Sequence, residues 1–149
     1  MSVEQLEFIL HDDKLRPVYE QYLRAMQAWE NLGFITRVED FTRAQQPEQQ
    51  RAIAQQIYET FIMPDAEHEL GDLDVKSRQA IEAELDNPTP RCFEYLVDYA
   101  TYTLASSTVE EFLRDTSYLD FVQSQFPRKK DGEEEEPTCL RHSILSCIE

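Results

Sequence analysis

Glycine is almost absent from this chain, and its scarcity limits the available folds more than any other feature. Three glycines are spread over 149 residues, so few positions suit the tight hairpin turns that connect antiparallel strands. Leu, Ala, Glu, Gln and Arg recur at helical spacing instead. The chain is therefore predicted to be all-α.

Apolar residues repeat every three or four positions in several stretches, which is the pattern of helices with one buried face. The clearest stretch begins at Glu48, where Ile53, Ile57 and Phe61 recur every fourth residue, and it ends at Pro64. Ala54, Tyr58 and Ile62 lie alongside these three residues. The apolar faces predicted elsewhere contain Val18, Tyr22, Leu23, Met26, Leu32, Ile35, Val38, Phe41, Val75, Ala80, Ile81, Leu85, Phe93, Leu96, Val97, Ala100 and Leu104. The apolar part of a short first helix is Val3, Leu6, Phe8, Ile9 and Leu10, and a closing helix is predicted from Phe112, Leu113, Tyr118, Leu119, Phe121 and Val122.

Residues 1–124 are predicted to form one domain, because a chain of this size buries roughly 70% of its unfolded surface around a single core. Beyond Phe126 the charge block "PRKKDGEEEEP" has no apolar periodicity. Residues 125–149 are therefore expected to be an acidic, disordered tail.

The charge balance excludes two classes of partner. The chain carries 14 Lys and Arg residues against 30 Asp and Glu residues, a formal charge of −16. Nucleic acids and anionic membranes are bound through basic patches, so neither is expected as a partner. The start of the chain has no basic segment followed by an apolar run, and nowhere do about 18 apolar residues follow one another. A cytoplasmic protein without an integral membrane segment is expected.

Residues that commonly carry chemistry form no recognisable site. Cys92, Cys139 and Cys147 match no zinc spacing, and Cys92 is interpreted as a reduced core thiol. Cys147 is third from the end of the sequence and so does not fit the prenylation pattern, which needs a cysteine at the fourth position. Palmitoylation of Cys139 or Cys147 is an open alternative that no sequence feature supports. The histidines at 11, 68 and 142 lie in polar contexts that favour solvated positions. No metal, cofactor or catalytic residue is predicted.

The order of several segments is more specific than the composition. These segments are "LEFIL", "VYEQYL", "ENLGF", "IAQQIYETFI", "LDVKSR", "NPTPRCFEYLVDYA" and "FLRDTSYLDFV". In this order and spacing they resemble the regulator of G-protein signalling (RGS) homology domain, over about residues 3–123. Each segment alone is weak, but their shared order makes a chance match improbable.

The resemblance implies a nine-helix fold with a four-helix bundle from the middle helices and a second subdomain from the two ends of the chain. It also implies a function without chemistry of its own. Accelerating members bind the switch loops of a G-protein α subunit (Gα) in its transition-state form. The Gα's own Arg and Gln are thereby held in place for GTP hydrolysis. A monomeric, cytoplasmic inhibitor of signalling, brought to the plasma membrane by its partner and lacking a cofactor, is the corresponding expectation.

Two of the three family contact segments lie in the middle of the chain. Glu30 and Asn31 match the family's Glu-Asn pair, whose Asn amide reaches the Gα switch. Asp72 precedes Leu73 and Asp74 where the family commonly has Asn, so an amide that can donate has become a carboxylate that only accepts.

The third segment departs further from the family. Accelerating members usually have Asp-Ser at the start of the last long helix and an Arg three residues after the Ser. This chain has Ser107 and Thr108 there, and Glu111 in place of the Arg. The resemblance therefore implies weakened acceleration, and a non-accelerating scaffold or protein-binding module is the alternative.

Each of these residues also has a simpler interpretation. Asn31 can cap a helix, and Asp72 and Asp74 can form turns around Gly71. Glu111 can be a solvent-exposed carboxylate in a first helical turn. The single tryptophan at 29 is either a staple onto the helical core, which we favour, or an exposed contact on the binding rim.

Overall fold

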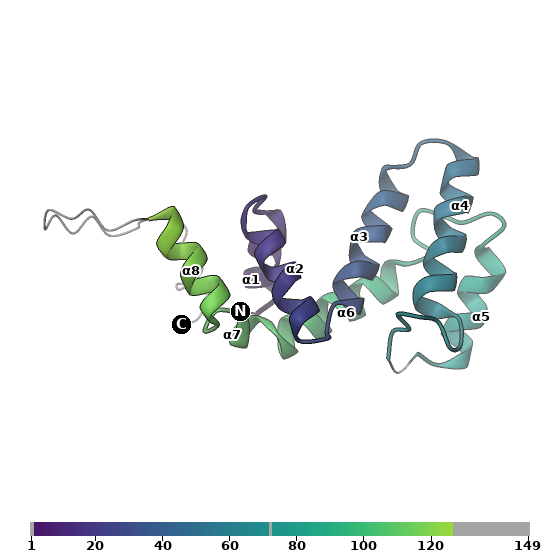
Figure 1. The fold of residues 1–149 in the computed structure, drawn as a ribbon. Helices are drawn as coiled ribbons and strands as arrows, with labels where there is room; N and C mark the ends of the chain where they lie inside the picture. The colour runs from purple at the N-terminus through teal and green to yellow at the C-terminus, as the bar shows by residue number, and fades with distance from the viewer. Residues whose placement is uncertain (1, 72, 127–149) are drawn as a thin grey trace, which may run out of the picture. The chain divides into compact units, whose positions relative to one another are not determined.

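The computed structural model describes residues 2–71 and 73–126. Their regular secondary structure is helical, with no strand among them (Figure 1). Eight α-helices and one π-helix account for the described part, in agreement with the all-α prediction. They are α1 (Ser2–His11), α2 (Leu15–Ala25), α3 (Glu30–Arg43), α4 (Pro47–Ile57), the π-helix η1 (Tyr58–Ile62), α5 (Val75–Glu84), α6 (Glu94–Ser107), α7 (Val109–Phe112) and α8 (Thr116–Gln125).

Several predictions fall outside the described residues. They concern Asp72, Cys139, Cys147, His142 and the tail after Phe126. Among the described helices, none combines the length and the apolar character that crossing a bilayer requires.

The chain divides into two compact units, which the resemblance also implied. The middle unit is Trp29–Thr101, and the terminal unit combines Met1–Ala28 with Tyr102–Glu149. The division falls inside α6, between Thr101 and Tyr102.

Four phenylalanines form the centre of the middle unit. Phe34, Phe41, Phe61 and Phe93 are each at most 2% exposed. Their rings meet edge to face, with centroids 5.8 Å apart for Phe34 and Phe61, 6.2 Å for Phe34 and Phe93, and 5.3 Å for Phe41 and Phe93. Edge-to-face pairs place the positive edge of one ring on the negative face of another. These contacts join α3, η1 and the turn before α6, while α4 packs along α3 (Figure 1).

The helix that begins at α4 widens into a π-helical turn before it ends. The Met63 N–H donates to the Tyr58 carbonyl five residues earlier, over 2.9 Å. Two adjacent side chains of this turn, Phe61 and Ile62, are both buried. The four-residue spacing in the sequence predicted the helix but not the change in its hydrogen bonding.

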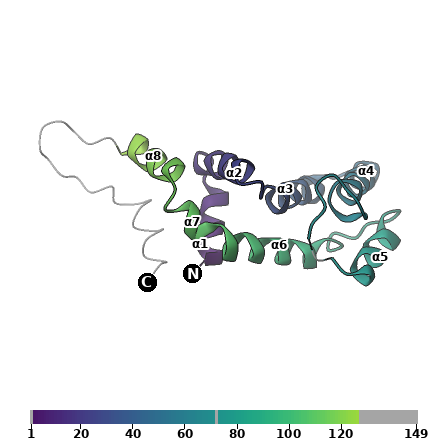
Figure 2. The same ribbon diagram turned by 60° about the horizontal axis from the view of Figure 1, so that its bottom comes forward.

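An aromatic cluster of three tyrosines around Phe112 lies in the core of the terminal unit. Phe112 contacts Tyr19, Tyr22 and Tyr118, with ring centroids 5.0, 5.2 and 5.5 Å away. In this unit α2 packs on α1 and α8, and α1 packs on α7 (Figure 2). Burial raises the pKa of Tyr19 to about 12, although its hydrogen bond with Thr108 opposes that shift.

Some predicted inward positions are wrong. Met26 and Val75 are 56% and 64% exposed, and Ala80 is exposed as well. Met26 lies just past the end of α2, where Gln27 turns the chain with φ 55°, and Val75 is the first residue of α5. The residues at 0% exposure that the periodicity missed are Leu15, Tyr19, Phe34 and Val109.

Cys92 lies in the turn before α6 and is half-buried, so it is not the fully buried helical thiol that was predicted. Burial, and then the nearby Glu84 carboxylate, raise the pKa of this thiol to about 12. A thiol with so high a pKa is almost entirely protonated near neutral pH and is a poor nucleophile.

Candidate functional site

The start of α3 is held by Trp29. This residue occupies the N-cap position, and its carbonyl accepts the first helical hydrogen bond from the Gly33 N–H, over 2.9 Å. The indole lies over Gly33 so closely that a Cβ at that position would stand 2.5 Å from its Cη2 atom. The absence of a side chain at Gly33 is therefore what lets the tryptophan fold back onto its own helix.

Trp29 also joins the start of α3 to more distant parts of the middle unit. Its ring lies 6.3 Å from that of Phe61 and meets His68 edge to face at 5.2 Å. The indole is half-buried. Trp29 therefore packs inward, as the staple interpretation predicted, and His68, which was expected in a solvated position, is partly covered by it.

Glu30 and Asn31 are the first two residues of α3 and are both half-buried. Because the N-cap position belongs to Trp29, Asn31 stands inside the helix and does not cap it. Its side chain makes no hydrogen bond within the part of the chain that the structure describes. The Asn31 side-chain amide therefore makes no capping hydrogen bond to the described residues.

The segment from Met63 to α5 is fastened to the π-helix. The His68 N–H donates to the Thr60 carbonyl over 3.0 Å, and the Leu70 N–H donates to the Phe61 carbonyl over 2.8 Å. Leu70 is 2% exposed and anchors the segment in the core. Toward α5, the Glu69 carboxylate pairs with the Arg78 guanidinium. These contacts hold residues 68–70, which come before the second predicted contact segment, and His68 among them lies against Trp29.

The residues predicted in that segment differ in their surroundings. Asp74 is exposed and caps α5, because its carboxylate accepts the Ser77 N–H over 2.6 Å. That backbone hydrogen bond lowers the pKa of Asp74. Leu73 is half-buried, and Asp72 lies outside the described residues. Asp74 was expected either as a Gα contact or as a turn former around Gly71, and the structure gives it the further role of capping α5.

The third predicted segment belongs to the terminal unit, and its two hydroxyls are engaged there. The Ser107 hydroxyl donates to the Thr103 carbonyl, and the Thr108 hydroxyl donates to the Leu104 carbonyl over 2.8 Å. The Thr108 hydroxyl also forms a hydrogen bond with the Tyr19 hydroxyl, 2.5 Å away. A short helix, α7, begins after Thr108 and ends at Phe112, and a separate helix, α8, begins at Thr116.

Glu111 points its charge into solvent from α7. Its neighbour Glu110 forms an ion pair with Arg114 over 3.0 Å, and both of these side chains are 77% exposed. Burial and then the Glu111 charge raise the pKa of Tyr22. The surface of α7 is therefore acidic at the position where accelerating relatives present an Arg.

The site residues thus form two groups. Glu30, Asn31, Leu73 and Asp74 belong to the middle unit, where the contact of Trp29 with His68 links their two segments. Ser107, Thr108 and Glu111 belong to the terminal unit. Within the described residues no group of three or more His, Cys, Asp or Glu side chains could hold a metal ion. The predicted contact residues within the described part therefore stand at or near helix ends in two separate units.

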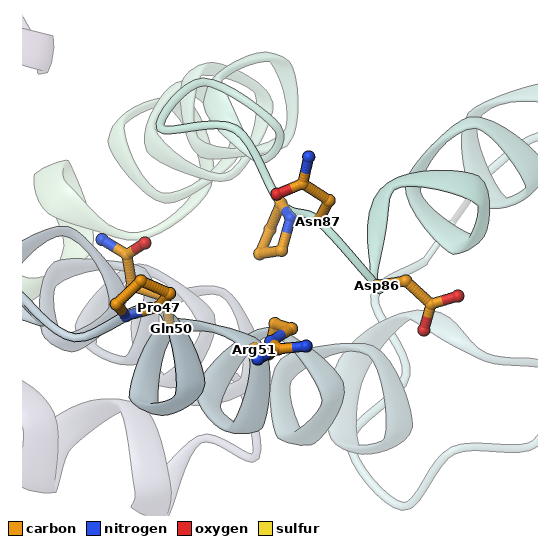
Figure 3. A pocket seen from close by; sticks show the side chains of 6 residues that line it. Pro47, Gln50, Arg51, Asp86 and Asn87 are labelled. Atoms are coloured by element: carbon orange, nitrogen blue, oxygen red, sulfur yellow. The ribbon is translucent and has the colours of Figure 1, made fainter.

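The apolar periodicity does not predict that Gly33 leaves room for the Trp29 ring or that His68 contacts that ring. The available signal was Gly33 itself, since glycine inside a helix is unfavourable unless a close approach requires it. A pocket of about 290 Å³ also occurs in the middle unit, lined by Pro47, Gln50, Arg51, Asp86, Asn87 and Pro88 (Figure 3). It contains none of the predicted contact residues.

Comparison with known proteins gives consistent matches. The model of the family described as "Regulator of G protein signaling domain" matches residues 5–121. Human "Regulator of G-protein signaling 18" is 27% identical over 140 residues, covering 94% of this chain and 55% of the relative. The mouse protein of that name is 26% identical over 86% of this chain and 51% of its own length. Human "Regulator of G-protein signaling 21" is 25% identical over 82% of this chain and 80% of its own length. The chain spans about half the length of the first two relatives.

Proposed function

Because the chain belongs to the regulator of G-protein signalling family, we propose that it binds a heterotrimeric G-protein α subunit in its GTP-bound or transition-state form and accelerates GTP hydrolysis. The contact residues in this proposal are Glu30, Asn31, Asp72, Leu73, Asp74, Ser107, Thr108 and Glu111. The protein acts as a monomer, without a cofactor, in the cytoplasm and at the inner face of the plasma membrane, where its Gα partner recruits it.

In this mechanism the chain supplies positioning and no reacting group. The Asn31 amide donates to the Gα switch that carries the catalytic Gln, and so holds that Gln where it orients the attacking water. The gain comes from ordering the Gα switches before the reaction, on an intrinsic Gα hydrolysis rate of order 10⁻² s⁻¹. A rigid binding surface is the requirement for such an effect.

The observation that carries the proposal is the packing of Trp29 between Gly33, Phe61 and His68. It fixes the start of α3, where Glu30 and Asn31 stand, against the segment that leads to Leu73 and Asp74. The family membership gives these positions their role, and the packing gives them the rigidity that the role needs.

Two of the proposed contact residues support an acceleration weaker than that of accelerating relatives. Glu111 is a carboxylate where an accelerating relative offers a guanidinium, and a carboxylate has no proton to donate to a switch backbone. Asp72 lacks the donor that an Asn at its position has. Removing one partner of a desolvated charge pair typically costs ~2–5 kcal/mol.

A second candidate function is a binding module that does not accelerate hydrolysis. The observation that favours it is the state of the third segment, where the Ser107 and Thr108 hydroxyls donate to carbonyls of their own helix. In that function the fold binds a partner without preferring the transition state of Gα.

The test is single-turnover GTP hydrolysis by each Gα of the source organism, with and without the protein. We expect modest acceleration by one or more of them, and its loss in Asn31→Ala. Asn87→Ala is the matched control, because it removes an exposed amide of the same unit far along the chain from the contact segments. If the unaltered protein accelerates none of these Gα subunits, the accelerating function is wrong.

Binding to three nucleotide states separates the two candidates. The Gα subunits are loaded with GDP, with GDP and aluminium fluoride, or with a GTP analogue, and their retention on the immobilised protein is compared. Preferential retention of the fluoride state supports acceleration, whereas equal retention of all three states supports the binding module.

A further inference from the structure

Three consecutive hydroxyl side chains stand where α6 ends and α7 begins, inside the terminal unit, and their surroundings differ (Figure 2). Ser106 and Ser107 are the last two residues of α6 and are both exposed. Thr108 is half-buried, and its hydroxyl bonds to the Leu104 carbonyl and the Tyr19 hydroxyl. Of the three hydroxyls, those of the two serines are therefore open to a modifying enzyme.

The residues that follow distinguish the two serines. Protein kinases select substrates by complementary charge, and acid-directed serine/threonine kinases recognise a carboxylate three residues after the acceptor hydroxyl. Ser107 has Glu110 at that distance, followed by Glu111, and both carboxylates are exposed. Ser106 has Val109 there, which is apolar and 0% exposed. Ser107 is the member of the triplet that combines an exposed hydroxyl with an accessible acid at the recognised spacing.

A few other hydroxyls of the chain have an acid at the same spacing. Thr36 lies in the middle of α3, where its hydroxyl donates to the Leu32 carbonyl over 2.9 Å. A kinase binds its acceptor in an extended segment, so the interior of a long helix is unsuitable. Ser117, with Asp120, and Ser146, with Glu149, are the alternative acceptors that an experiment has to separate from Ser107.

We propose that Ser107 is a phosphorylation site for an acid-directed serine/threonine kinase, and that the phosphate weakens the Gα contact of the third segment. In the transfer, the Ser107 Oγ atom attacks the γ-phosphorus of magnesium-bound ATP. The bond from that phosphorus to the β,γ-bridging oxygen breaks, ADP leaves, and the hydroxyl proton passes to the catalytic Asp of the kinase. The effect on Gα rests on the proposed function, whereas the modification itself does not.

Phosphorylation would change the end of α6 in two ways. The Ser107 side chain would lose the proton that it donates to the Thr103 carbonyl. The phosphate carries about −1.5 to −2 charges at pH 7, and it would stand at a helix C-terminus, where the macrodipole favours positive charge. Glu110 and Glu111 follow within four residues and would repel it. We therefore expect the end of α6 to loosen where the third contact segment begins.

The first experiment maps the modification without Gα. The full chain is incubated with casein kinase 2 and magnesium-bound ATP, and the phosphate is located by tandem mass spectrometry. We expect it on Ser107. Glu110→Gln removes the recognised charge and should slow this phosphorylation about tenfold, whereas Ser106→Ala should leave it unchanged. Phosphate found only on Ser117, Ser146 or another residue, or an unchanged rate in Glu110→Gln, would overturn the proposal.

The second experiment measures the effect on Gα. The chain phosphorylated at Ser107 is isolated by anion exchange, and its retention of Gα loaded with GDP and aluminium fluoride is compared with that of the unmodified chain. We expect retention to weaken about two- to fivefold. In Glu111→Arg the new guanidinium can pair with the phosphate, so phosphorylation should strengthen retention there. An equal weakening in both backgrounds, or no change in either, would contradict the effect assigned to the phosphate.

A third measurement keeps the two proposals apart. If the unmodified chain retains no Gα in any nucleotide state, the proposed function is wrong, and the mapped phosphate still decides whether Ser107 is modified. The thermal unfolding midpoint then reports the loosened helix end. We expect phosphorylation at Ser107 to lower it by about 1–4 °C, and an unchanged midpoint would contradict the loosening.

Discussion

At the scale of single residues, Gly33 has a role that its helix propensity would not suggest. Replacing a helical glycine by alanine ordinarily stabilises a helix by roughly 0.5–1 kcal/mol. Here the new Cβ would stand 2.5 Å from the Trp29 ring, so the indole has to move away from Phe61 and His68. We expect Gly33→Ala to lower the free energy of unfolding by about 1–3 kcal/mol, measured by urea denaturation.

A matched glycine provides the control for that substitution. A Cβ at Gly71 would meet nothing within 4 Å, so Gly71→Ala should leave the unfolding free energy nearly unchanged. Trp29→Leu removes the obstructing ring, and Gly33→Ala made in that background should cost much less than in the unaltered protein. An equal cost in both backgrounds would contradict the role assigned to Trp29.

The residues of the site could be predicted only in part. Glu30, Asn31 and Glu111 stand in recognisable local segments, so their order in the sequence was enough to single them out. The contact between Trp29 and His68 joins residues that are far apart in the chain, and it depends on how η1 turns the chain back. No local periodicity encodes that geometry. Gly33 was the one local sign of a close approach.

At the scale of helices, the buried phenol of Tyr19 ties α2 to the start of α7. Its hydroxyl bonds to Thr108, and burial raises its pKa from 10.0 to about 12. The folded state keeps this group neutral where the unfolded chain already ionises. The stabilisation is therefore complete below pH 10 and is lost as the pH rises toward 12, a loss of roughly 2–3 kcal/mol.

Comparing Tyr19→Phe with the unaltered protein isolates this effect. Urea denaturation at several values between pH 8 and pH 11.5 should show a shallower fall in stability for the variant. Cys92, Tyr22 and Tyr58 also have raised pKa values, but they are present in both proteins and cancel in the difference. Parallel curves would show that Tyr19 ionises equally easily in the folded and unfolded states.

The helices themselves were largely predictable, and the errors occur at their ends. Ile57 and Phe61 were expected on one buried face and are buried, although the turn that holds Phe61 is π-helical. Met26 and Val75 follow the apolar period but lie where α2 has ended and where α5 begins. Periodicity describes which face of a helix is apolar. Whether the last turn of a helix reaches the core depends on tertiary packing, which the apolar spacing does not determine.

At the scale of the whole molecule, a formal charge of −16 influences the approach of any partner, so a local charge effect has to be separated from it. The combined variant Ser107→Asp with Glu111→Arg restores the pair that accelerating relatives carry. We expect it to accelerate single-turnover hydrolysis by Gα at least about tenfold more than the unaltered protein, since such pairs are typically worth ~2–5 kcal/mol.

Glu110→Arg is the matched control, because it makes the same charge reversal one residue away and breaks only an exposed pair with Arg114, which contributes little to stability. If both variants gain equally and the gain disappears at high salt, long-range attraction is responsible and Glu111 is not a contact residue. A gain confined to the combined variant that persists in salt would assign the weakness of this surface to Ser107 and Glu111.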